Sequence, residues 1–274
     1  MIKPRLGGWL PDAQQPDADP SKDYKLSSNI HNFEAAALGM KNVIQEVNGV
    51  LDLRPFCSPI EDQSTAGSCV GNGTVGSLEF LLIRDGFPYI DLSRLFTYYN
   101  ARLQVQEQAT DSGAYIRLAF KTLSTLGTCS EATWPYDLSK LFIRPSWAAF
   151  REAFANKINE YYSIGGTGQT RIDFINRALQ SQHVVVFGMT VDDDFVAHRG
   201  SQPVAMPKKV RTGTGGHCMV IVGYDNNQDC WIVRNSWGRA WGMGGYAYVP
   251  RAFLDASDAS DFWVPTSFKF NSQE

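Results

Sequence analysis

The sequence lacks several features that would define other classes of protein. No apolar run approaches the ~20 residues that a helix needs to cross a bilayer, and residues 1–9 lack the apolar stretch of a secretory signal. The net charge of −3 gives no reason to expect nucleic acid or an anionic membrane as a main partner. Five cysteines in 274 residues do not make a disulfide framework. We expect a protein without a membrane anchor that is cytoplasmic, is exported by a signal-independent route, or was expressed without its signal.

One of the five cysteines, Cys69, opens an apolar run with roughly helical spacing. The run contains Val70, Val75, Leu78, Leu81 and Leu82, and Gly86 follows where a helix would end. A helix N-terminus stabilises negative charge through its unpaired N–H groups and aligned peptide dipoles, and a thiol attacks only as the thiolate. The pattern therefore indicates that Cys69 is a candidate nucleophile on the first turn of a helix.

A nucleophilic thiol also needs a base, and the base needs a third group that orients its ring. His217 heads an uninterrupted apolar run that indicates a buried strand, and Asn235 ends a second such run. Turn-forming residues at 225–229 separate the two runs, which are therefore expected to form a hairpin. That hairpin would bring the histidine and the asparagine onto neighbouring strands.

Together with Gln63 and the run Asn235-Ser236-Trp237-Gly238, these residues resemble the papain-like cysteine peptidases, in particular a bacterial branch with short pro-segments. The resemblance implies an α+β fold in which a helical N-terminal subdomain and a barrel-like β-sheet subdomain meet at a cleft that holds the active site. It also implies a hydrolase, a cysteine-type endopeptidase that acts on polypeptides and uses no metal or cofactor.

The resemblance also assigns roles to matching positions. Cys69 would be the nucleophile, His217 the general base and acid, Asn235 the residue that orients the imidazole, and Gln63 a donor to the oxyanion. Trp237 would shield the histidine–asparagine hydrogen bond from water. The backbone of Gly113 would pair with an extended substrate. The remaining expected substrate-binding residues are Ser112, Tyr115, Gly215, Gly216 and Cys218.

The sequence departs from the family pattern around the nucleophile. Val70 follows Cys69 where the family usually has an aromatic residue, and Gly71 and Gly73 each lower helix propensity by about 1 kcal/mol. Ala66 stands where many relatives have a cysteine that forms a disulfide beside the site. The active-site loop must therefore be held in another way. Pairing among the other cysteines, Cys57, Cys129, Cys218 and Cys230, stays open.

The chain is expected to divide into an N-terminal segment and a peptidase domain. Residues 1–49 form a candidate pro-segment that would occupy the cleft in cis and make the protein a zymogen; a disordered arm or an external strap is the alternative. Residues 50–274 would form the peptidase domain, mainly helical over 50–158 and mainly β over 159–274. Helices are expected near 32–47, 69–85, 93–106, 113–126 and 145–158, and strands near 159–163, 184–191, 217–224, 229–235 and 245–250.

Three functions fit the pattern. The first is a peptidase, with endopeptidase activity favoured over exopeptidase activity. The second is a thiol acyltransferase. The third is a catalytically silent member of the family that uses the cleft for binding. The other histidines, His31, His183 and His198, have no ligand pattern, and the acidic run at 192–194 is typical of a solvated turn. We therefore expect a monomer whose partners are a polypeptide substrate and its own N-terminal segment.

Overall fold

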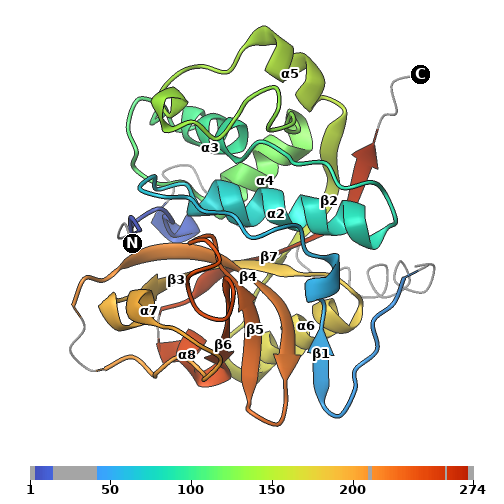
Figure 1. Cartoon of the computed structure of the whole chain (residues 1–274), viewed down its shortest axis with the longest axis vertical. Helices are drawn as coiled ribbons and strands as arrows, with labels where there is room; N and C mark the ends of the chain where they lie inside the picture. The colour runs from blue at the N-terminus through green and yellow to red at the C-terminus, as the bar shows by residue number, and fades with distance from the viewer. Residues whose placement is uncertain (1–3, 15–41, 209–211, 257, 271–274) are drawn as a thin grey trace.

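The helices of the first half of the chain and the strand-rich second half occupy two layers of the molecule. The computed structural model describes residues 4–14, 42–208, 212–256 and 258–270. In Figure 1 the helices of the first half of the chain form the upper layer, and the strand-rich half forms the lower layer. This arrangement confirms the expected α+β architecture. Among the described residues, none of the helices has the length and apolarity to span a bilayer.

The helices form the upper layer and also lie beside the sheet. They are α2 (Cys69–Arg84), α3 (Arg94–Leu103), α4 (Ile116–Thr125), α5 (Trp147–Ala153), α6 (Gly168–Gln180), α7 (Asp193–Ala197) and α8 (Arg251–Ala256). The 3-10 turns are η1 (Asp12–Gln14), η3 (Arg54–Phe56) and η4 (Leu138–Lys140). Serine side chains cap α3 and α5: Ser93 accepts a hydrogen bond from the N–H of Phe96, and Ser146 accepts one from the N–H of Ala149.

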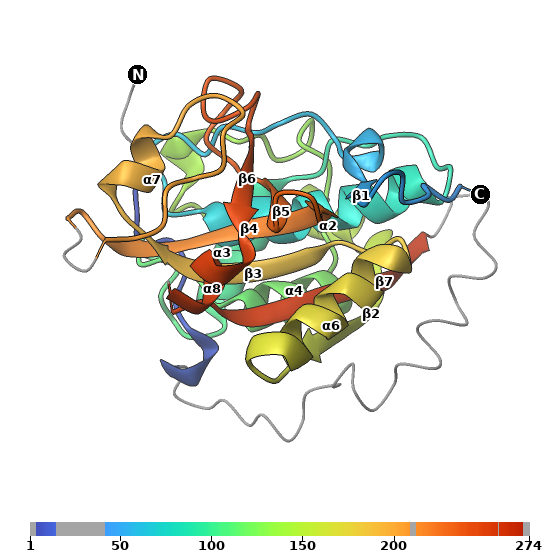
Figure 2. The ribbon, with the colours of Figure 1, turned by 90° about the horizontal axis from the view of Figure 1, so that it is seen from below.

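One antiparallel sheet forms the lower layer. Its strands are β1 (Val50–Asp52), β2 (Asn156–Ile164), β3 (Val185–Val191), β4 (Gly215–Asp225), β5 (Cys230–Arg234), β6 (Tyr246–Pro250) and β7 (Ser260–Phe270). They lie in the order β2-β7-β3-β4-β5-β6, and β1 pairs with β4. The expected hairpin is formed by β4 and β5, which start their pairing at Asp225 and Cys230. Helix α6 contacts β2 and β3 on the strand-rich side of the molecule (Figure 2).

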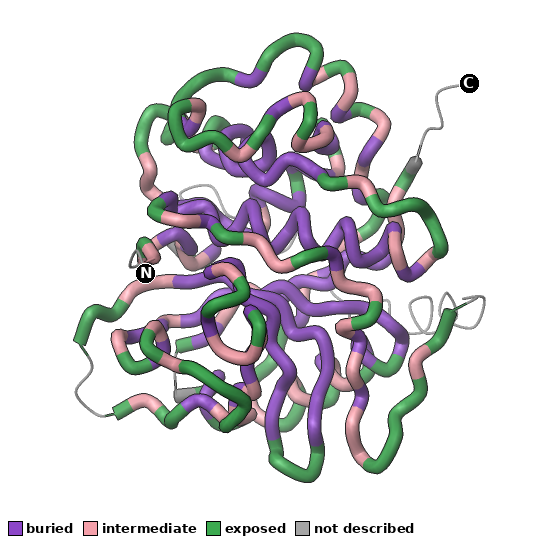
Figure 3. Tube along the Cα trace, in the orientation of Figure 1, coloured by how far each residue is buried: buried purple, intermediate pink, exposed green. Residues whose placement is uncertain are grey.

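Helix α2 lies between the two layers and is buried on nearly all sides (Figure 3). Its glycines allow this close packing. A Cβ at Gly71 would lie 2.8 Å from the carbonyl oxygen of Arg94, and one at Gly73 would lie 3.0 Å from Sγ of Cys218. The glycines that lower the intrinsic helix propensity thus let α2 approach α3 on one side and β4 on the other.

Several expected elements differ from those observed. The helix expected over 145–158 ends at Ala153, because the chain enters β2 at Asn156, whose backbone and side chain bond to Thr128. The helix expected over 113–126 begins only at Ile116. Residues 42–47 are not helical, and the rest of the helix expected over 32–47 lies outside the described residues. Strand β7 was not expected, since Pro265 within it argues against a central strand.

Candidate active site

Cys69 begins α2 and lies at the junction of the two layers. Its side chain is fully buried. The covering chain is the N-terminal segment: a Cβ at Gly8 would lie 2.7 Å from Sγ of Cys69 and would also overlap the carbonyl of Gly67. Only glycine at position 8 therefore fits against the thiol.

His217 and Asn235 meet on the facing strands. The distance from Nε2 of His217 to Oδ1 of Asn235 is 2.7 Å, and both residues are buried. The indole of Trp237 stacks on the imidazole, with ring centroids 4.3 Å apart at an interplanar angle of 24°. The stacked indole therefore covers one face of the imidazole. The other ring nitrogen, Nδ1, has no hydrogen-bond partner among the described residues.

The side chain of Gln63 is fixed at both ends of its amide. Nε2 donates to the carbonyl of Ala66 over 2.8 Å, and Oε1 accepts from the hydroxyl of Ser236 over 2.7 Å. The bond to Ala66 assigns the amide orientation, because a carbonyl oxygen can only accept and must therefore face the NH₂ group. Backbone pairing joins the same segments, since the N–H of Gln63 donates to the carbonyl of Ser236. One N–H of the Gln63 amide remains available to a substrate.

The active-site loop is held by a carboxylate in place of a disulfide. All five cysteines, each within the described residues, are free. The N–H of Gly67 donates to both carboxylate oxygens of Asp111 at 3.0 Å, and the hydroxyl of Tyr98 donates to Oδ1 of Asp111 at 2.6 Å. The same hydroxyl accepts from the N–H of Gly113 at 3.1 Å. Asp111 therefore ties the loop before Cys69 to the loop that carries the expected substrate-binding glycine.

Residues 4–14 run along the cleft between the layers. The N–H of Gly7 donates to the carbonyl of Gly216 over 2.9 Å. Ala114 pairs with the segment in a parallel bridge: its N–H donates to the carbonyl of Gly8 over 3.0 Å, and its carbonyl accepts from the N–H of Leu10 over 3.0 Å. The side chain of Trp9 is buried with 3% exposed. The segment thus uses backbone groups on both sides of the cleft.

The other expected substrate-binding residues all lie beside this segment or close to it. The backbone groups that pair with the segment belong to Ala114, one residue after the expected Gly113, whose own φ of +90° brings its Cα against Gly7 and Gly8. Leu6 packs on Gly215, and Trp9 packs on Gly216. Three further residues occupy neighbouring positions: Ser112 is half-buried before Gly113, Tyr115 precedes α4, and Cys218 follows His217 and faces Gly73.

Burial disfavours the charged forms of both the thiol and the imidazole. Desolvation raises the pKa of Cys69 to about 12, against a smaller lowering by backbone hydrogen bonding from Cys218 and Val70. Desolvation also lowers the pKa of His217 to about 4, and the bond to Asn235 offsets only part of this. A neutral thiol is a poor nucleophile. Burial at the covered site therefore opposes formation of a thiolate–imidazolium pair.

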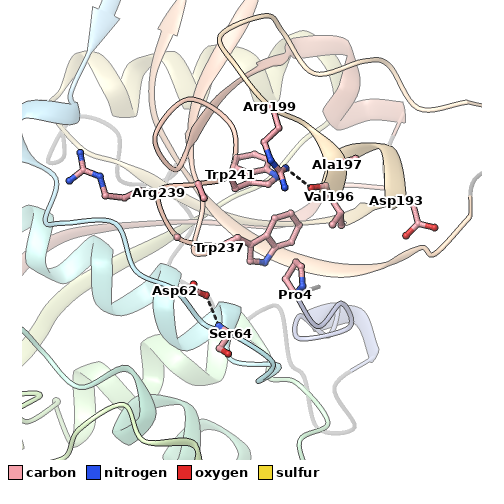
Figure 4. Close-up of a pocket in the computed structure, with 12 residues that line it drawn as sticks. Pro4, Asp62, Ser64, Asp193, Val196, Ala197, Arg199, Trp237, Arg239 and Trp241 are labelled. Atoms are coloured by element: carbon pink, nitrogen blue, oxygen red, sulfur yellow. Dashed lines mark hydrogen bonds between the residues drawn. The ribbon is translucent and has the colours of Figure 1, made fainter. Parts of the chain in front are cut away.

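Beyond Pro4 the cleft continues into an open pocket of about 450 Å³. Figure 4 shows that Pro4 and Trp237 face each other at one end of it and that the short helix α7 contributes its wall. Trp237 therefore separates the imidazole from this pocket. The pocket is suited to the part of a peptide that lies on the histidine side of the bond to be cut.

Four residues of the site are absent from the expected set: Trp9, Ala114, Ser236 and Asp261. Ser236 could have been predicted from its position between Asn235 and Trp237, since the neighbours of a site residue often help to orient the site. For Trp9 and Asp261 no local pattern exists, because they meet only in the folded chain, where Nε1 of Trp9 donates to Oδ2 of Asp261 over 2.9 Å.

Comparison with known proteins identifies the family. The model of the papain family of cysteine proteases matches residues 49–259. An uncharacterised peptidase C1-like protein of Acanthamoeba polyphaga mimivirus is 34% identical over 261 residues, which cover 90% of this chain and 80% of that protein. The chain therefore belongs to the papain family and is a cysteine-type peptidase, a hydrolase, as the sequence predicted.

Solved structures agree with this assignment. Xylellain, a cysteine protease from Xylella fastidiosa, superposes with a TM-score of 0.78 at 28% identity, covering 98% of each chain. Digestive procathepsin L 3 of Tenebrio molitor superposes with a TM-score of 0.65 at 20% identity, covering 86% of this chain and 79% of that one. The second likeness concerns the fold alone. The expected papain-like architecture is thus confirmed.

Proposed function

We propose that the protein hydrolyses peptide bonds through a thioester formed on Cys69. The observation that carries this proposal is the hydrogen bond from His217 to Asn235 under Trp237, which leaves Nδ1 of the imidazole free for a proton of the thiol. The backbone of Cys218, the residue after His217, lies within hydrogen-bonding reach of Cys69. This neighbourhood supports the assignment of the thiol and the imidazole to one site.

The reaction proceeds in two steps once the N-terminal segment has left. The thiol of Cys69 gives its proton to Nδ1 of His217, and the thiolate attacks the peptide carbonyl. The Gln63 amide and the N–H of Cys69 donate to the oxygen that becomes negative. The imidazolium then protonates the leaving amine, and a thioester remains. Water, deprotonated by the same imidazole, attacks the thioester, and the acid and the free thiol are released.

We further propose that the N-terminal segment, including residues 4–14, is an inhibitory pro-segment acting in cis. Because His217 protonates the leaving amine, the amine side of a substrate must lie near Trp237, where Pro4 lies. The segment runs from Pro4 past Cys69 to the pocket of Trp9, so its direction is opposite to that of a cleavable peptide. Moreover, the carbonyl of Gly8 bonds to Ala114 and not to an oxyanion donor. Both observations support inhibition without cleavage at this point.

Substitution of Cys69 by alanine tests the mechanism. The wild-type chain is expected to shorten at its N-terminus during incubation and to hydrolyse peptides, whereas the Cys69→Ala chain does neither. N-terminal sequencing and a peptide-release assay measure the two effects. Product analysis with an added amine separates hydrolysis from acyl transfer, because an acyltransferase would yield mainly the amide. A wild-type chain that stays intact and silent, with Cys69 open to alkylation, would instead support a binding protein.

The seating of the segment is expected to weaken as the pH rises. Burial, followed by the nearby charge of Asp261, raises the pKa of Asp12 to about 7, although Arg117 lies close by. A free aspartate ionises near pH 3.9. The seated form therefore holds an extra proton between these values, so its stability is complete at low pH and falls progressively up to about pH 7.

Alkylation of Cys69 by iodoacetamide measures this effect. The wild-type rate is divided at each pH by the rate of the Asp12→Asn chain, which carries no titrating group at position 12, so that ionisation of the thiol itself cancels. The ratio is expected to rise at least about tenfold from pH 4 to pH 7, given a shift of this size. A flat wild-type ratio would contradict the assignment.

A further inference from the structure

The side chain of Trp9 occupies a pocket whose shape fits a large flat ring. Two glycines on adjacent strands, Gly188 of β3 and Gly216 of β4, form its floor. A Cβ at Gly188 would overlap the fused ring atoms of the indole, and a Cβ at Gly216 would lie 3.0 Å from Cε3. Because Gly8 lies on Cys69 and Leu10 pairs with Ala114, this pocket adjoins the point of attack.

The inner end of the pocket carries the carboxylate of Asp261. Oδ2 of Asp261 accepts from Nε1 of Trp9 over 2.9 Å and from the N–H of Asp12 over 2.8 Å. Both donors belong to the N-terminal segment. The groups that remain when the segment leaves are Ser260, which bonds to the carboxyl, and Arg117, which acts on it through space. Oδ2 then faces an empty pocket without the two donors it has in the seated form.

A buried carboxylate oxygen that has lost its donors favours an incoming group that replaces them. A site that hydrogen-bonds a substrate N–H discriminates strongly against the analogue that lacks it, because its own polar group is then left unpaired. Size alone discriminates only weakly between similar side chains. The chemistry of the pocket therefore requires a flat apolar body and an N–H at its far end.

We propose that Asp261 is a specificity-determining residue that selects tryptophan in the substrate position occupied by Trp9 in the covered enzyme. This inference rests on the proposed peptidase function and names the preferred substrate of the same site. The alternative is that the carboxylate serves only to anchor the segment through Asp12. Two experiments on the full chain separate these roles.

The first experiment needs no turnover. The rate of Cys69 alkylation by iodoacetamide reports how often the segment leaves, and it is measured for Trp9→Phe in the presence and absence of Asp261. Asp261→Gly suits the comparison, because residue 261 has a φ of +57°, which glycine adopts without strain. Trp9→Phe is expected to speed alkylation about tenfold to a hundredfold with Asp261 in place, the range for a hydrogen bond to a charged group. In the Asp261→Gly chain the same change should have little effect. Equal effects in both chains would overturn the proposal.

The second experiment uses peptides and the Gly8→Ala chain, in which overlap of the added Cβ with Cys69 and Gly67 weakens the seating of the segment. Matched substrates carry tryptophan, 3-benzothienylalanine, arginine or leucine at the position concerned; benzothienylalanine has the two fused rings of tryptophan with sulfur in place of N–H. Tryptophan is expected to exceed benzothienylalanine in kcat/KM by at least about tenfold, and the preference should vanish in Asp261→Gly.

The leucine peptide is the control for folding and chemistry: its rate in each chain gives the baseline against which the rates for tryptophan and benzothienylalanine are compared. Equal rates for tryptophan and benzothienylalanine, or a faster rate for arginine than for tryptophan, would overturn the assignment. If no peptide is cleaved, the proposed function fails, and the alkylation cycle alone decides whether Asp261 recognises the indole. An Asp261→Asn chain, which keeps a neutral acceptor, should show an intermediate preference.

Discussion

Replacing Gln63 with alanine is expected to lower kcat for peptide hydrolysis by about 10²- to 10³-fold, the range for loss of one oxyanion donor. The side chain is fully buried, and its amide is held by Ala66 and by the hydroxyl of Ser236. A donor held in this way stabilises the developing negative charge without reorganising during the reaction. Because that charge exists only in the transition state, KM should change much less than kcat.

Alkylation of Cys69 provides the control for this prediction, since attack on iodoacetamide forms no oxyanion. In a Gly8→Ala background the Gln63→Ala change should leave the alkylation rate unaltered while hydrolysis falls. Ser236→Ala is the matched variant. It removes the hydroxyl that holds the Gln63 amide but leaves the amide itself in place, so the loss in kcat should be smaller. An equal fall in alkylation and hydrolysis would mean that Gln63 acts through the thiol or through folding.

Replacing Gly8 with alanine is expected to raise the alkylation rate of Cys69 by about tenfold to a hundredfold. The added Cβ would lie 2.7 Å from Sγ, and the cost of such overpacking is about 1–3 kcal/mol. Gly8 does not have a positive φ, so alanine fits its backbone and the effect comes from the overlap alone. The seated form is destabilised while the peptidase layers stay unchanged.

The measurement is the pseudo-first-order rate of iodoacetamide incorporation at constant pH, followed by mass spectrometry. Gly165→Ala is the matched control, because a Cβ there meets nothing within 4 Å and the residue has no positive φ. Trp9→Ala should act in the same direction as Gly8→Ala, since it removes the indole from its pocket. If Gly8→Ala left the rate at the wild-type value, the segment would not be the barrier to the thiol.

The candidate site could be located from the sequence because its members stand in local patterns. Cys69 opens a helical run, and His217 and Asn235 sit at the ends of two strands joined by a turn. The pairing of two strands in a hairpin can be predicted from the two apolar runs and the turn between them, which are close together in the sequence. The expected proximity of the last two residues follows from that geometry, and Nε2 of His217 lies 2.7 Å from Oδ1 of Asn235.

Interactions between distant segments could not be predicted in the same way. Trp9 and Asp261 stand at opposite ends of the chain, and only the complete fold brings them to 2.9 Å. Strand β7 shows a related limit: Pro265 lacks an N–H, yet it pairs with Tyr161 where the register between β2 and β7 shifts. Such an irregularity accommodates a residue that the local rule excludes from a central strand.

The use of Asp111 in place of a disulfide affects the response of the protein to redox conditions. The loop before Cys69 is held by hydrogen bonds from Gly67 and Tyr98 to one carboxylate, and each of the five cysteines is free. Strong reductants therefore have no structural crosslink to break. They can restore an oxidised catalytic sulfur while the surrounding architecture keeps its geometry.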